Sequence, residues 1–441
     1  MFNHLLRIYS ILYTLLVILY LPVLAYRVLL QNKRFGTLIK RLSAPEKPPS
    51  TYTSAPWIHA VSVGEIKAVQ PLVEALLKDH EIVLVSTVTE TGHSLACSLF
   101  PDRVQIFYFP IDWKWLCCKY LRLLKPSCIL LAETEIWPGF INAAHSLQIP
   151  VLLINGRISA RSFSQYYKIR LFLQPLLQQV ELFCMQSRKD KERIIKLGAL
   201  PDRVHEMGNL KYDYQLPENS TRERVRDMIR DLMVTQPQDL LWICGSTREG
   251  EEEILLPIYE QLLGDFPSLR LLLAPRHPHR VEAISRLVEN LGFSSCRRSQ
   301  LNATNPHSPQ ILLLDSIGDL SYLYKLADVV FMGGSLVKKG GHNVIEAAYF
   351  AKPILFGPYM ENFHEISQAF LNAYAAVQVE SAPELTLKLR ELLKDPKARK
   401  WLGRNARKVI RKNQGAIHRT LEIVQNYKGT IQRKGNLDQH Q

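Results

Sequence analysis

Acidic side chains follow several apolar stretches of this sequence, at points where strands of a parallel sheet would end. The first is Glu65, in the turn 63–67 (VGEIK) that follows the apolar run 57–62 (WIHAVS). Ligands of open parallel sheets gather at the carboxyl ends of the strands, so a carboxylate here can serve as a general base toward an attacking hydroxyl. An acid at a helix start can also do no more than stabilise the helix dipole. The residue alone leaves both interpretations open.

Two further acids stand at the end of the apolar run 128–134 (CILLAET): Glu133 within its last two residues and Glu135 directly after it. In extended chain both carboxylates would face the same side and could hold a hydroxylated acceptor, or they are ordinary turn acids. Arg157 lies in NGRIS (155–159), where amide, guanidinium and hydroxyl groups suit oxyanion or sugar contacts, and Lys211 adds a cation near the presumed cleft. Each of these signals is weak on its own.

The second half of the chain carries glycine turns and cations at comparable points. The turn 245–251 (GSTREGE) contains Ser246 and opens a helical pattern, a geometry whose free N–H groups bind phosphate. Arg276 lies in APRHP (274–278), after another apolar run. The segment 333–346 (GGSLVKKGGHNVIE) holds four glycines, including Gly334 next to Ser335, that let the backbone approach an anion. The alternative is a pair of glycine turns before a capped helix.

In the same segment, Asn343 and Glu346 are one helical turn apart, so we expect their side chains to face the same way. A carboxylate beyond such a glycine loop is well placed to accept hydrogen bonds from ribose hydroxyls. The pattern is neither a Walker A loop nor GxGxxG.

Short apolar runs separated by helical patterns must position these residues. Strands that alternate with helices predict parallel sheets covered by helices. The rhythm pauses at about 212–235, which is polar and charged, and then restarts, so the sequence predicts two α/β units of similar size joined by a polar bridge. The apolar runs are 57–62, 81–87, 104–110, 128–134, 150–156 and 182–187 before the pause, and 240–247, 269–277, 310–316, 328–335 and 352–358 after it.

The 441 residues, 47% hydrophobic and 22% charged, exclude a disordered, collagen-like or multi-span membrane protein. An uncharged stretch, 8–26, is close to the length that spans a bilayer, and Arg27, Lys33, Arg34, Lys40 and Arg41 follow it. We expect a membrane anchor with the body of the protein in the cytoplasm; a signal peptide and a helix that only dips into the bilayer are the alternatives. The net charge of +14 favours anionic partners, and seven cysteines without zinc spacing indicate reduced thiols.

Nine ordered motifs together resemble the 3-deoxy-D-manno-oct-2-ulosonic acid (Kdo) transferases of lipid A assembly in Gram-negative bacteria, over nearly the whole chain. The motifs are HAVSVGE (59–65), ETEIWP (133–138), NGRIS (155–159), GNLKYD (208–213), GSTREGEEE (245–253), APRHPHR (274–280), DSIGDLSYLY (315–324), GGSLVKKGGHNVIEAA (333–348) and GPYMENF (357–363). The resemblance implies the GT-B glycosyltransferase fold, with two Rossmann-like domains around a central cleft. It also implies the inner membrane, with the catalytic domains on the cytoplasmic side.

The resemblance assigns roles to individual residues. Glu65 corresponds to the general base, which deprotonates an acceptor hydroxyl for attack on C2 of Kdo with inversion. Glu135 and Lys211 match motifs credited with transition-state stabilisation. Ser246, Gly334, Ser335, Glu133 and Arg157 are additional candidates. The residues that correspond to CMP contacts are Pro275, Arg276, Ile317, Gly318, Asp319, Asn343, Val344, Ile345 and Glu346.

The implied partners are CMP-Kdo, a phosphorylated lipid A precursor and inner-membrane lipids, without nucleic acid, metal or cofactor, since cations and helix amides can stabilise the departing CMP. The departures from the family pattern are small, with Asp319 where Glu is common and Gly139 where Asn often follows the proline. We expect six regions: a membrane anchor (1–30), a basic linker (31–56), an acceptor-binding domain (57–212), an interdomain linker (213–235), a CMP-Kdo-binding domain (236–415) and a C-terminal helix or tail (416–441) that crosses back to the first domain.

Three competing interpretations remain at this point. A GT-B enzyme that uses a UDP-sugar would share the sheets, the glycine loop and the ribose-binding acid. A nucleotide-sugar epimerase of the same fold would need no lipid acceptor, and the apolar N-terminal stretch weighs against it. A membrane-tethered binder of anions or nucleic acid is supported by the charge alone and leaves the acids at the strand ends unexplained.

Overall fold

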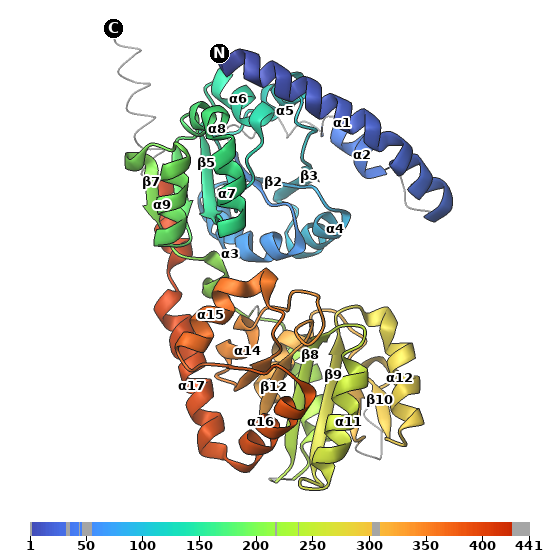
Figure 1. The fold of residues 1–441 in the computed structure, drawn as a ribbon. Coiled ribbons are helices and arrows are strands. Elements are labelled where there is room, and N and C mark those ends of the chain that lie inside the picture. The colour runs from blue at the N-terminus through green and yellow to red at the C-terminus, as the bar shows by residue number, and fades with distance from the viewer. Residues whose placement is uncertain are drawn as a thin grey trace. The chain divides into compact units, whose positions relative to one another are not determined.

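The computed structural model describes residues 2–31, 36–43, 45, 55–216, 218–236, 238–301 and 309–425. The chain divides into two units, Met1–Asp213 with Gln414–Gln441, and Tyr214–Asn413. Each unit is built on a parallel sheet with helices packed against it (Figure 1).

The sheet of the first unit has the order β3-β2-β1-β4-β5-β6-β7, with every described pairing parallel. Because β1 leads to β2 on one side and β4 to β5 on the other, a topological switch point lies between β1 and β4. In such sheets the switch point is where ligands bind. The strands are β1 (Pro56–His59), β2 (Val83–Thr87), β3 (Val104–Tyr108), β4 (Cys128–Ala132), β5 (Val151–Gly156), β6 (Leu182–Met185) and β7 (Val204–Glu206).

Alternating side chains of these strands build two apolar layers. Trp57 and Ile129 point into a cluster with α5 and α6, whereas Ile58 and Leu130 point into a second cluster with α3. Burial on both faces explains why these strands read as continuous apolar runs rather than alternating ones. The helices are α1 (Phe2–Gln31), α2 (Gly36–Leu42), α3 (Val63–Asp79), α4 (Glu90–Leu99), α5 (Lys114–Leu124), α6 (Pro138–Ser146), α7 (Ala160–Lys168), α8 (Arg170–Leu177) and α9 (Arg188–Leu197).

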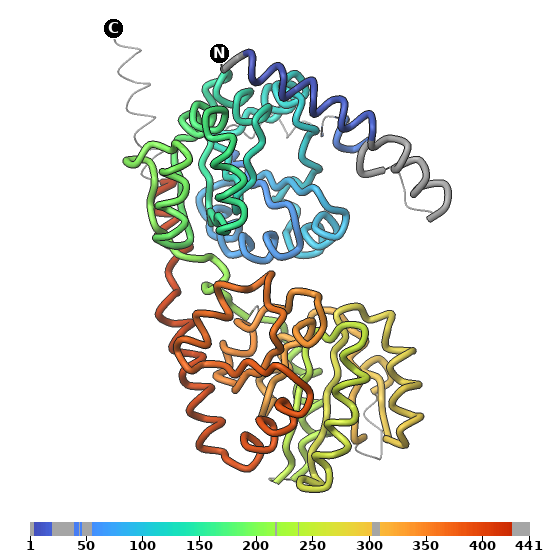
Figure 2. The backbone as a smooth tube through the Cα atoms, in the orientation of Figure 1, coloured from blue at the N-terminus to red at the C-terminus, as the bar shows by residue number. Residues whose placement is uncertain are grey.

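The last described residues of the chain, 416–425, are helical and belong to the first unit. Ala416 and Val424 join the apolar cluster that contains α3 and β6. The carboxylate of Asp213 accepts the N–H of Gly415 at 2.5 Å and that of Ile417 at 2.6 Å, which fixes the start of this helix. Figure 2 traces the return of the chain, in red.

The second unit has a parallel sheet in the order β10-β11-β9-β8-β12-β13-β14, with its switch point between β8 and β12. Its strands are β8 (Leu240–Thr247), β9 (Leu269–Pro275), β10 (Ser295–Arg297), β11 (Ile311–Leu313), β12 (Val329–Met332), β13 (Ile354–Phe356) and β14 (Val377–Gln378). Its helices are α10 (Ser220–Met233), α11 (Glu252–Leu263), α12 (Val281–Asn290), α13 (Leu320–Leu323), α14 (Ile345–Tyr349), α15 (His364–Asn372), α16 (Ala382–Lys394) and α17 (Pro396–Asn413).

Two expected linkers differ from the structure. Most of 213–235 is α10, whose Val225, Ile229 and Met233 are buried, so this segment is part of the second unit and not a bridge. Within 31–56, α2 is tied to the first unit, because Arg41 Nε donates to the Phe109 carbonyl at 3.0 Å. The charged composition of this segment predicts a polar bridge, but one apolar residue per turn is enough to dock a helix.

The expected membrane anchor falls on α1. Among the described residues, no helix has both the length and the mean hydropathy needed to cross a bilayer. Lys33, Arg34 and the polar tail after 425 lie outside the described residues.

Candidate active site

The switch point of the first unit brings together residues that are far apart in the sequence. Glu65 lies on the first turn of α3, directly after β1, and Glu133 follows β4, the neighbouring strand. Lys211, from the short 3-10 helix η2 (Leu210–Asp213), places its Nζ 3.0 Å from a Glu133 carboxylate oxygen. Two acids and a cation therefore meet at the edge where a parallel sheet binds its ligand.

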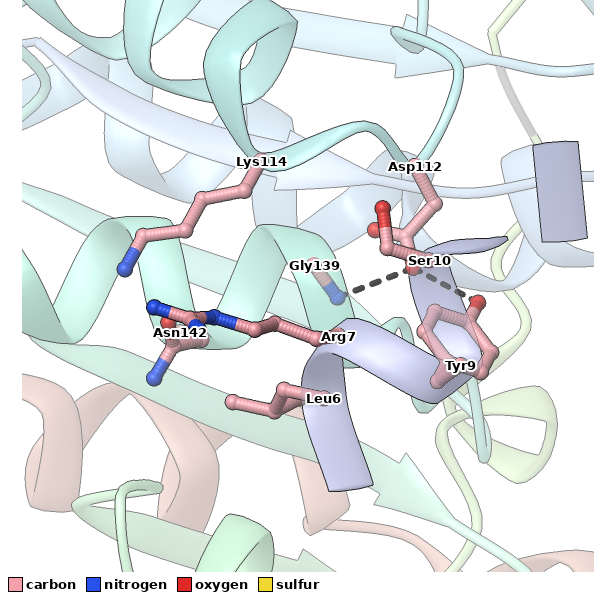
Figure 3. Close-up of a pocket in the computed structure, with 8 residues that line it drawn as sticks. All are labelled: Leu6, Arg7, Tyr9, Ser10, Asp112, Lys114, Gly139 and Asn142. Atoms are coloured by element: carbon pink, nitrogen blue, oxygen red, sulfur yellow. Dashed lines mark hydrogen bonds between the residues drawn. The ribbon is translucent and has the colours of Figure 1, made fainter. Parts of the chain in front are cut away.

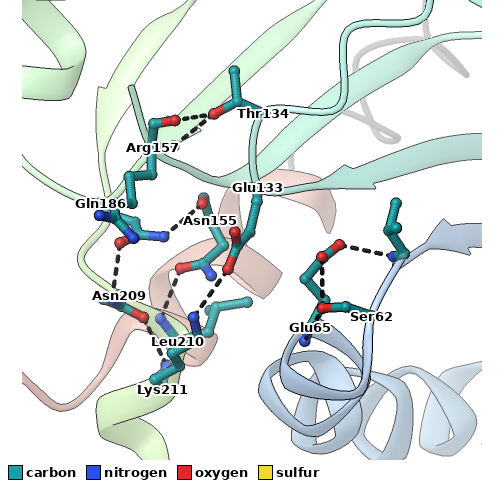
Figure 4. Close-up of polar contacts among 11 residues, drawn as sticks. Ser62, Glu65, Glu133, Thr134, Asn155, Arg157, Gln186, Asn209, Leu210 and Lys211 are labelled. Carbon is teal, nitrogen blue, oxygen red and sulfur yellow. Dashed lines mark hydrogen bonds and ion pairs between the residues drawn. The ribbon is translucent and has the colours of Figure 1, made fainter. Parts of the chain in front are cut away.

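Glu65 is held by the start of its own helix. Ser62 is the N-cap residue of α3: its hydroxyl donates to Glu65 Oε1 at 2.8 Å, and the N–H of Val61 donates to Oε2 at 2.8 Å (Figure 4). The Ser62 hydroxyl also accepts the N–H of Glu65 at 3.4 Å, so the pattern is a variant of the capping box in which the N–H of Val61 replaces that of the N-cap residue, and it accounts for the position of the carboxylate. Each oxygen accepts one bond and keeps a free lone pair, so capping leaves Glu65 able to accept a proton.

Burial changes the acidity of Glu65, whose residue is 8% exposed. Desolvation, with the neighbouring Glu133 carboxylate, raises the pKa of Glu65 to about 7, against the opposing bonds from Val61 and Ser62. Burial also raises the pKa of Glu135. A carboxylate whose pKa lies near neutrality is suited to general-base catalysis, because it is both partly ionised and a competent proton acceptor. A simple helix cap does not require this property.

The segment that carries Glu133 and Glu135 is not extended, so the expectation that an extended chain turns both carboxylates to the same side is wrong. Glu133 has φ +56°, the left-handed region, and the chain turns before α6 begins. The reciprocal contact between Thr134 and Arg157 holds the turn: the Thr134 hydroxyl donates to the Arg157 carbonyl and accepts the Arg157 N–H. Arg157, proposed for its guanidinium, thus contributes its backbone to this contact (Figure 4).

A chain of amide side chains positions Lys211. Asn155 Oδ1 accepts the N–H of Leu210 at 3.0 Å, and Asn209 Nδ2 donates to Gln186 Oε1 at 2.8 Å. Gln186 in turn donates to the carbonyl of Asn155 at 2.8 Å. Because these residues stand at the ends of β5 and β6, the network ties the loop before Lys211 to the sheet (Figure 4). Gln186 was not singled out in the sequence, where a lone Gln after an apolar run carries no signal.

In the second unit the glycine loop after β12 already holds an anion, and that anion is Glu251. Its carboxylate is fully buried and accepts the N–H groups of Arg248, Gly334, Ser335 and Leu336 at 2.6 to 3.0 Å. The N–H of Arg248, in the turn expected to bind phosphate, and three amides of the glycine loop expected to approach an anion are therefore used internally. Gly334, with φ +70°, allows the loop to fold around the carboxylate.

Two other candidates of the second unit, Ser335 and Ser246, help to hold the shape of these turns. Ser335 is fully buried, and its hydroxyl donates to the Met332 carbonyl and accepts the N–H of Gly357. Ser246 has φ +60° at the end of β8. We conclude that both shape the loops beside the switch point.

Arg248, which the sequence analysis did not single out, presents a positioned cation. Its Nε donates to His342 Nε2 at 3.2 Å and its Nη1 lies 2.8 Å from His277 Nε2. Burial and the cations Arg248 and Arg276 lower the pKa of His342 to about 3, and burial and the same arginines lower that of His277. Both imidazoles are therefore neutral acceptors that clamp the guanidinium next to Arg276. The sequence signal that could have identified Arg248 is its position directly after the glycine and hydroxyl residues 245–247.

Side-chain hydrogen bonds and ion pairs hold the turns that the resemblance assigns to CMP. Asp319 is buried, accepts the Ser316 hydroxyl at 2.6 Å and lies 3.4 Å from Arg298 and 3.8 Å from Arg222, while Ile317 next to it is 81% exposed. Glu346 accepts the Ser321 hydroxyl at 2.6 Å. Asn343 lies before α14, and its Oδ1 accepts the N–H of Ile345, two residues on, in a turn that leads into that helix. It is therefore not on the helix with Glu346, as the expected helical spacing of the two side chains requires.

Comparison with known proteins places the chain among transferases. Residues 32–214 match the family model described as 3-deoxy-D-manno-octulosonic-acid transferase (kdotransferase), and residues 300–409 match glycosyl transferases group 1. A 3-deoxy-D-manno-octulosonic acid transferase of Haemophilus influenzae is 35% identical over 84% of this chain and 86% of its own. That of Bordetella pertussis is 30% identical over 90% of this chain and 91% of its own.

Solved structures match the fold. A glycosyltransferase from Rickettsia africae superposes with a TM-score of 0.56 at 14% identity, over 84% of this chain and 98% of its own. A putative UDP-N-acetylglucosamine 2-epimerase from Listeria monocytogenes gives 0.55 at 12% identity, over 85% and 96%. The two parallel-sheet α/β units are thus consistent with the GT-B glycosyltransferase fold. With relatives of this identity over most of its length, the chain belongs to the 3-deoxy-D-manno-octulosonic acid transferase family.

Proposed function

We propose that this protein transfers Kdo from CMP-Kdo to a hydroxyl of a lipid A precursor, with inversion at C2. The observation that carries the proposal is the buried Glu65, with its pKa near 7, beside Glu133 and Lys211 at the switch point of the first unit. Acceptor hydroxyl, base and cation are what a sugar transfer of this kind needs.

The chemistry assigned to Glu65 is one proton transfer. Its carboxylate takes the proton from the acceptor hydroxyl as that oxygen bonds to C2 of Kdo. The bond from C2 to the phosphate oxygen breaks at the same time, and its electron pair leaves with CMP. Attack opposite the departing phosphate inverts C2. Lys211, whose loop is held by the Asn155 network, stabilises the negative charge that develops in the transition state, and Glu135 stabilises the positive charge.

CMP is assigned to the second unit. Pro275 and Arg276, the turn 317–319 and residues 343–346 supply its contacts, as the resemblance implies. The guanidinium of Arg276, with Arg248 beside it, provides the positive charge that the leaving phosphate requires.

Replacing Arg248 by glutamine is expected to raise the KM for CMP-Kdo about tenfold, since a charge-assisted hydrogen bond contributes roughly 1.5–3 kcal/mol. Steady-state kinetics with varied CMP-Kdo measures this change. Arg286→Gln, on the exposed face of α12, is the matched control and should leave the KM unchanged. Equal KM values for Arg248→Gln and the native chain would contradict a role at the phosphate.

The pH dependence of kcat/KM is expected to follow the ionisation of Glu65. Because burial raises its pKa to about 7, the base is lost by protonation below neutrality, and kcat/KM should fall tenfold per pH unit below about 7. Ser62→Ala removes a bond that lowers this pKa, so it should move the acid limb to higher pH. A kcat/KM that stays flat down to about pH 5.5, where circular dichroism shows the chain still folded, would contradict the assignment.

We also propose that transfer needs no metal or other cofactor, because arginine and lysine side chains neutralise the departing CMP. Dialysis against EDTA should therefore leave kcat unchanged, and added Mg²⁺ should not raise it. A loss of activity on chelation that Mg²⁺ restores would show that the cations of the chain are insufficient.

The donor nucleotide decides between this proposal and a UDP-sugar enzyme of the same fold. CMP should inhibit transfer competitively against CMP-Kdo, with UDP and UMP much weaker. Stronger inhibition by UDP would contradict the proposal. We further propose the bacterial inner membrane as the site of action, with the catalytic units on the cytoplasmic side, because the acceptor is a membrane lipid and the chain carries a net charge of +14.

A further inference from the structure

In the first half of α1, polar side chains contact the first unit and most of the large aliphatic side chains point away from it. The Tyr9 hydroxyl donates to Asp112 at 2.8 Å, and Trp113 Nε1 donates to the Thr14 hydroxyl at 2.9 Å. The opposite face is 50% to 76% exposed at Ile8, Ile11, Leu12, Leu15, Leu16, Ile18 and Leu19. A helix on a domain surrounded by water has the reverse pattern. This outer face is therefore built to lie in an apolar environment.

A cavity of about 400 Å³ opens where this part of α1 meets α5 and α6. Arg7, Lys114 and Asn142 place their nitrogen atoms on one side of it, away from Asp112 (Figure 3). No carboxylate of the described residues forms an ion pair with Arg7 or Lys114. The two cations thus face open space beside the apolar face of α1.

Asp112 does not cancel this charge. It is 1% exposed, and its oxygens accept the Tyr9 hydroxyl, the Gly139 N–H at 2.9 Å and the Phe140 N–H at 2.7 Å. Two cations against one fully bonded carboxylate leave the cavity positive. The guanidinium and ammonium groups suit the oxygens of a phosphate, and the Asn142 amide, which donates one N–H to Gln179 Oε1 at 3.3 Å, has a second N–H to offer.

Neighbouring side chains fit a membrane interface. Trp115, next to Lys114, is 63% exposed and its ring stacks on Trp113 at a centroid distance of 6.0 Å. Leu171 on α8 is 69% exposed, beside Phe172, whose ring stacks on Tyr9. Exposed indole, aliphatic side chains and cations on adjoining helices are typical of a surface that meets lipid headgroups.

We propose that this cavity binds the phosphate of an anionic phospholipid, while residues 4–19 of α1 lie in the plane of the bilayer surface with their apolar face toward the acyl chains. The contacts of Tyr9 and Thr14 with the first unit favour this orientation. A helix that crossed the bilayer would be surrounded by lipid and would lose these contacts. The proposal rests on the proposed membrane location but not on Kdo transfer.

Vesicle flotation of the full chain tests the proposal without CMP-Kdo or acceptor, so its failure and that of the proposed function are distinguishable. The probes are phosphatidylcholine vesicles with and without phosphatidylglycerol. Replacing both Arg7 and Lys114 by glutamine should weaken binding to the anionic vesicles roughly thirtyfold, at about 1 kcal/mol per cation, and leave the melting temperature unchanged. Leu12→Ser with Leu16→Ser should weaken binding to both kinds of vesicle.

Lys397→Gln with Lys400→Gln removes the same charge from exposed positions on α17 and should change binding less than threefold. Equal losses in the two double variants would overturn the cavity as a specific site. Displacement of the protein by inorganic phosphate, but not by chloride of matched ionic strength, would identify a free-phosphate site instead. Undiminished binding of the Arg7 and Lys114 variant would also overturn the proposal.

Discussion

Replacing Glu65 by glutamine is expected to lower kcat for Kdo transfer by about three orders of magnitude, within the range that general-base catalysis contributes. Glutamine has nearly the same shape and its amide oxygen still accepts one of the bonds from Val61 or Ser62, so the helix start should survive. What it cannot do is accept the proton of the acceptor hydroxyl. The KM for CMP-Kdo should change little, because the contacts assigned to CMP lie in the second unit.

Glu74→Gln is the matched control for this experiment. Glu74 lies on the same helix, is exposed, and accepts a bond from Gln70 at 2.9 Å. Its replacement should leave kcat within twofold of the native value. A loss of less than tenfold in Glu65→Gln, with circular dichroism unchanged, would reduce Glu65 to the helix-capping role that its sequence position also allows.

Replacing Glu251 by glutamine is expected to lower the free energy of unfolding of the second unit by about 3 kcal/mol. Four backbone N–H groups converge on this buried carboxylate, and a neutral amide offers one acceptor oxygen and two competing donors. Oε2 accepts the N–H groups of Arg248 and Gly334, and Oε1 accepts those of Ser335 and Leu336, so one of these two pairs would lose its partner away from water. CMP should also bind more weakly, since the loop that follows β12 would lose its shape.

Hydrogen exchange of the amides at 333–336, together with calorimetry, measures this effect. The neighbouring Glu253→Gln removes the same charge from an exposed position and should leave both readouts unchanged. Unaltered protection of Gly334 to Leu336 in Glu251→Gln would show that solvent or other groups satisfy these amides, contrary to the geometry described.

Apolar runs predicted the strands that position the candidate residues of each unit. The eleven runs coincide with β1 to β6, β8, β9 and β11 to β13. The strands that the sequence did not reveal, β7, β10 and β14, are two or three residues long and lie at or near sheet edges. Unlike β11 and β13, which are equally short, their sequences VHE, SCR and VQ are not continuously apolar, so pairing with a neighbour decides their conformation.

The candidate site was predictable only as a set of strand ends. Glu65 and Glu133 meet because β1 and β4 are neighbours, and strand order does not follow from local pattern. The role of Glu251 depends on the positive φ of Gly334, 83 residues away, and on four amides that converge in space. The exposed apolar face of α1 could not be predicted either, because an apolar stretch does not show which of its few polar residues contact the rest of the protein.

The most direct test of the account is mass spectrometry of a lipid A precursor after incubation with the detergent-purified protein and CMP-Kdo, run beside Glu65→Gln. We predict Kdo mass increments on the acceptor with the native chain and none with the variant over the same time. The number of increments would also count the residues transferred. No increment with the native chain, under conditions in which a known member of the family is active, would contradict the assignment of donor and acceptor.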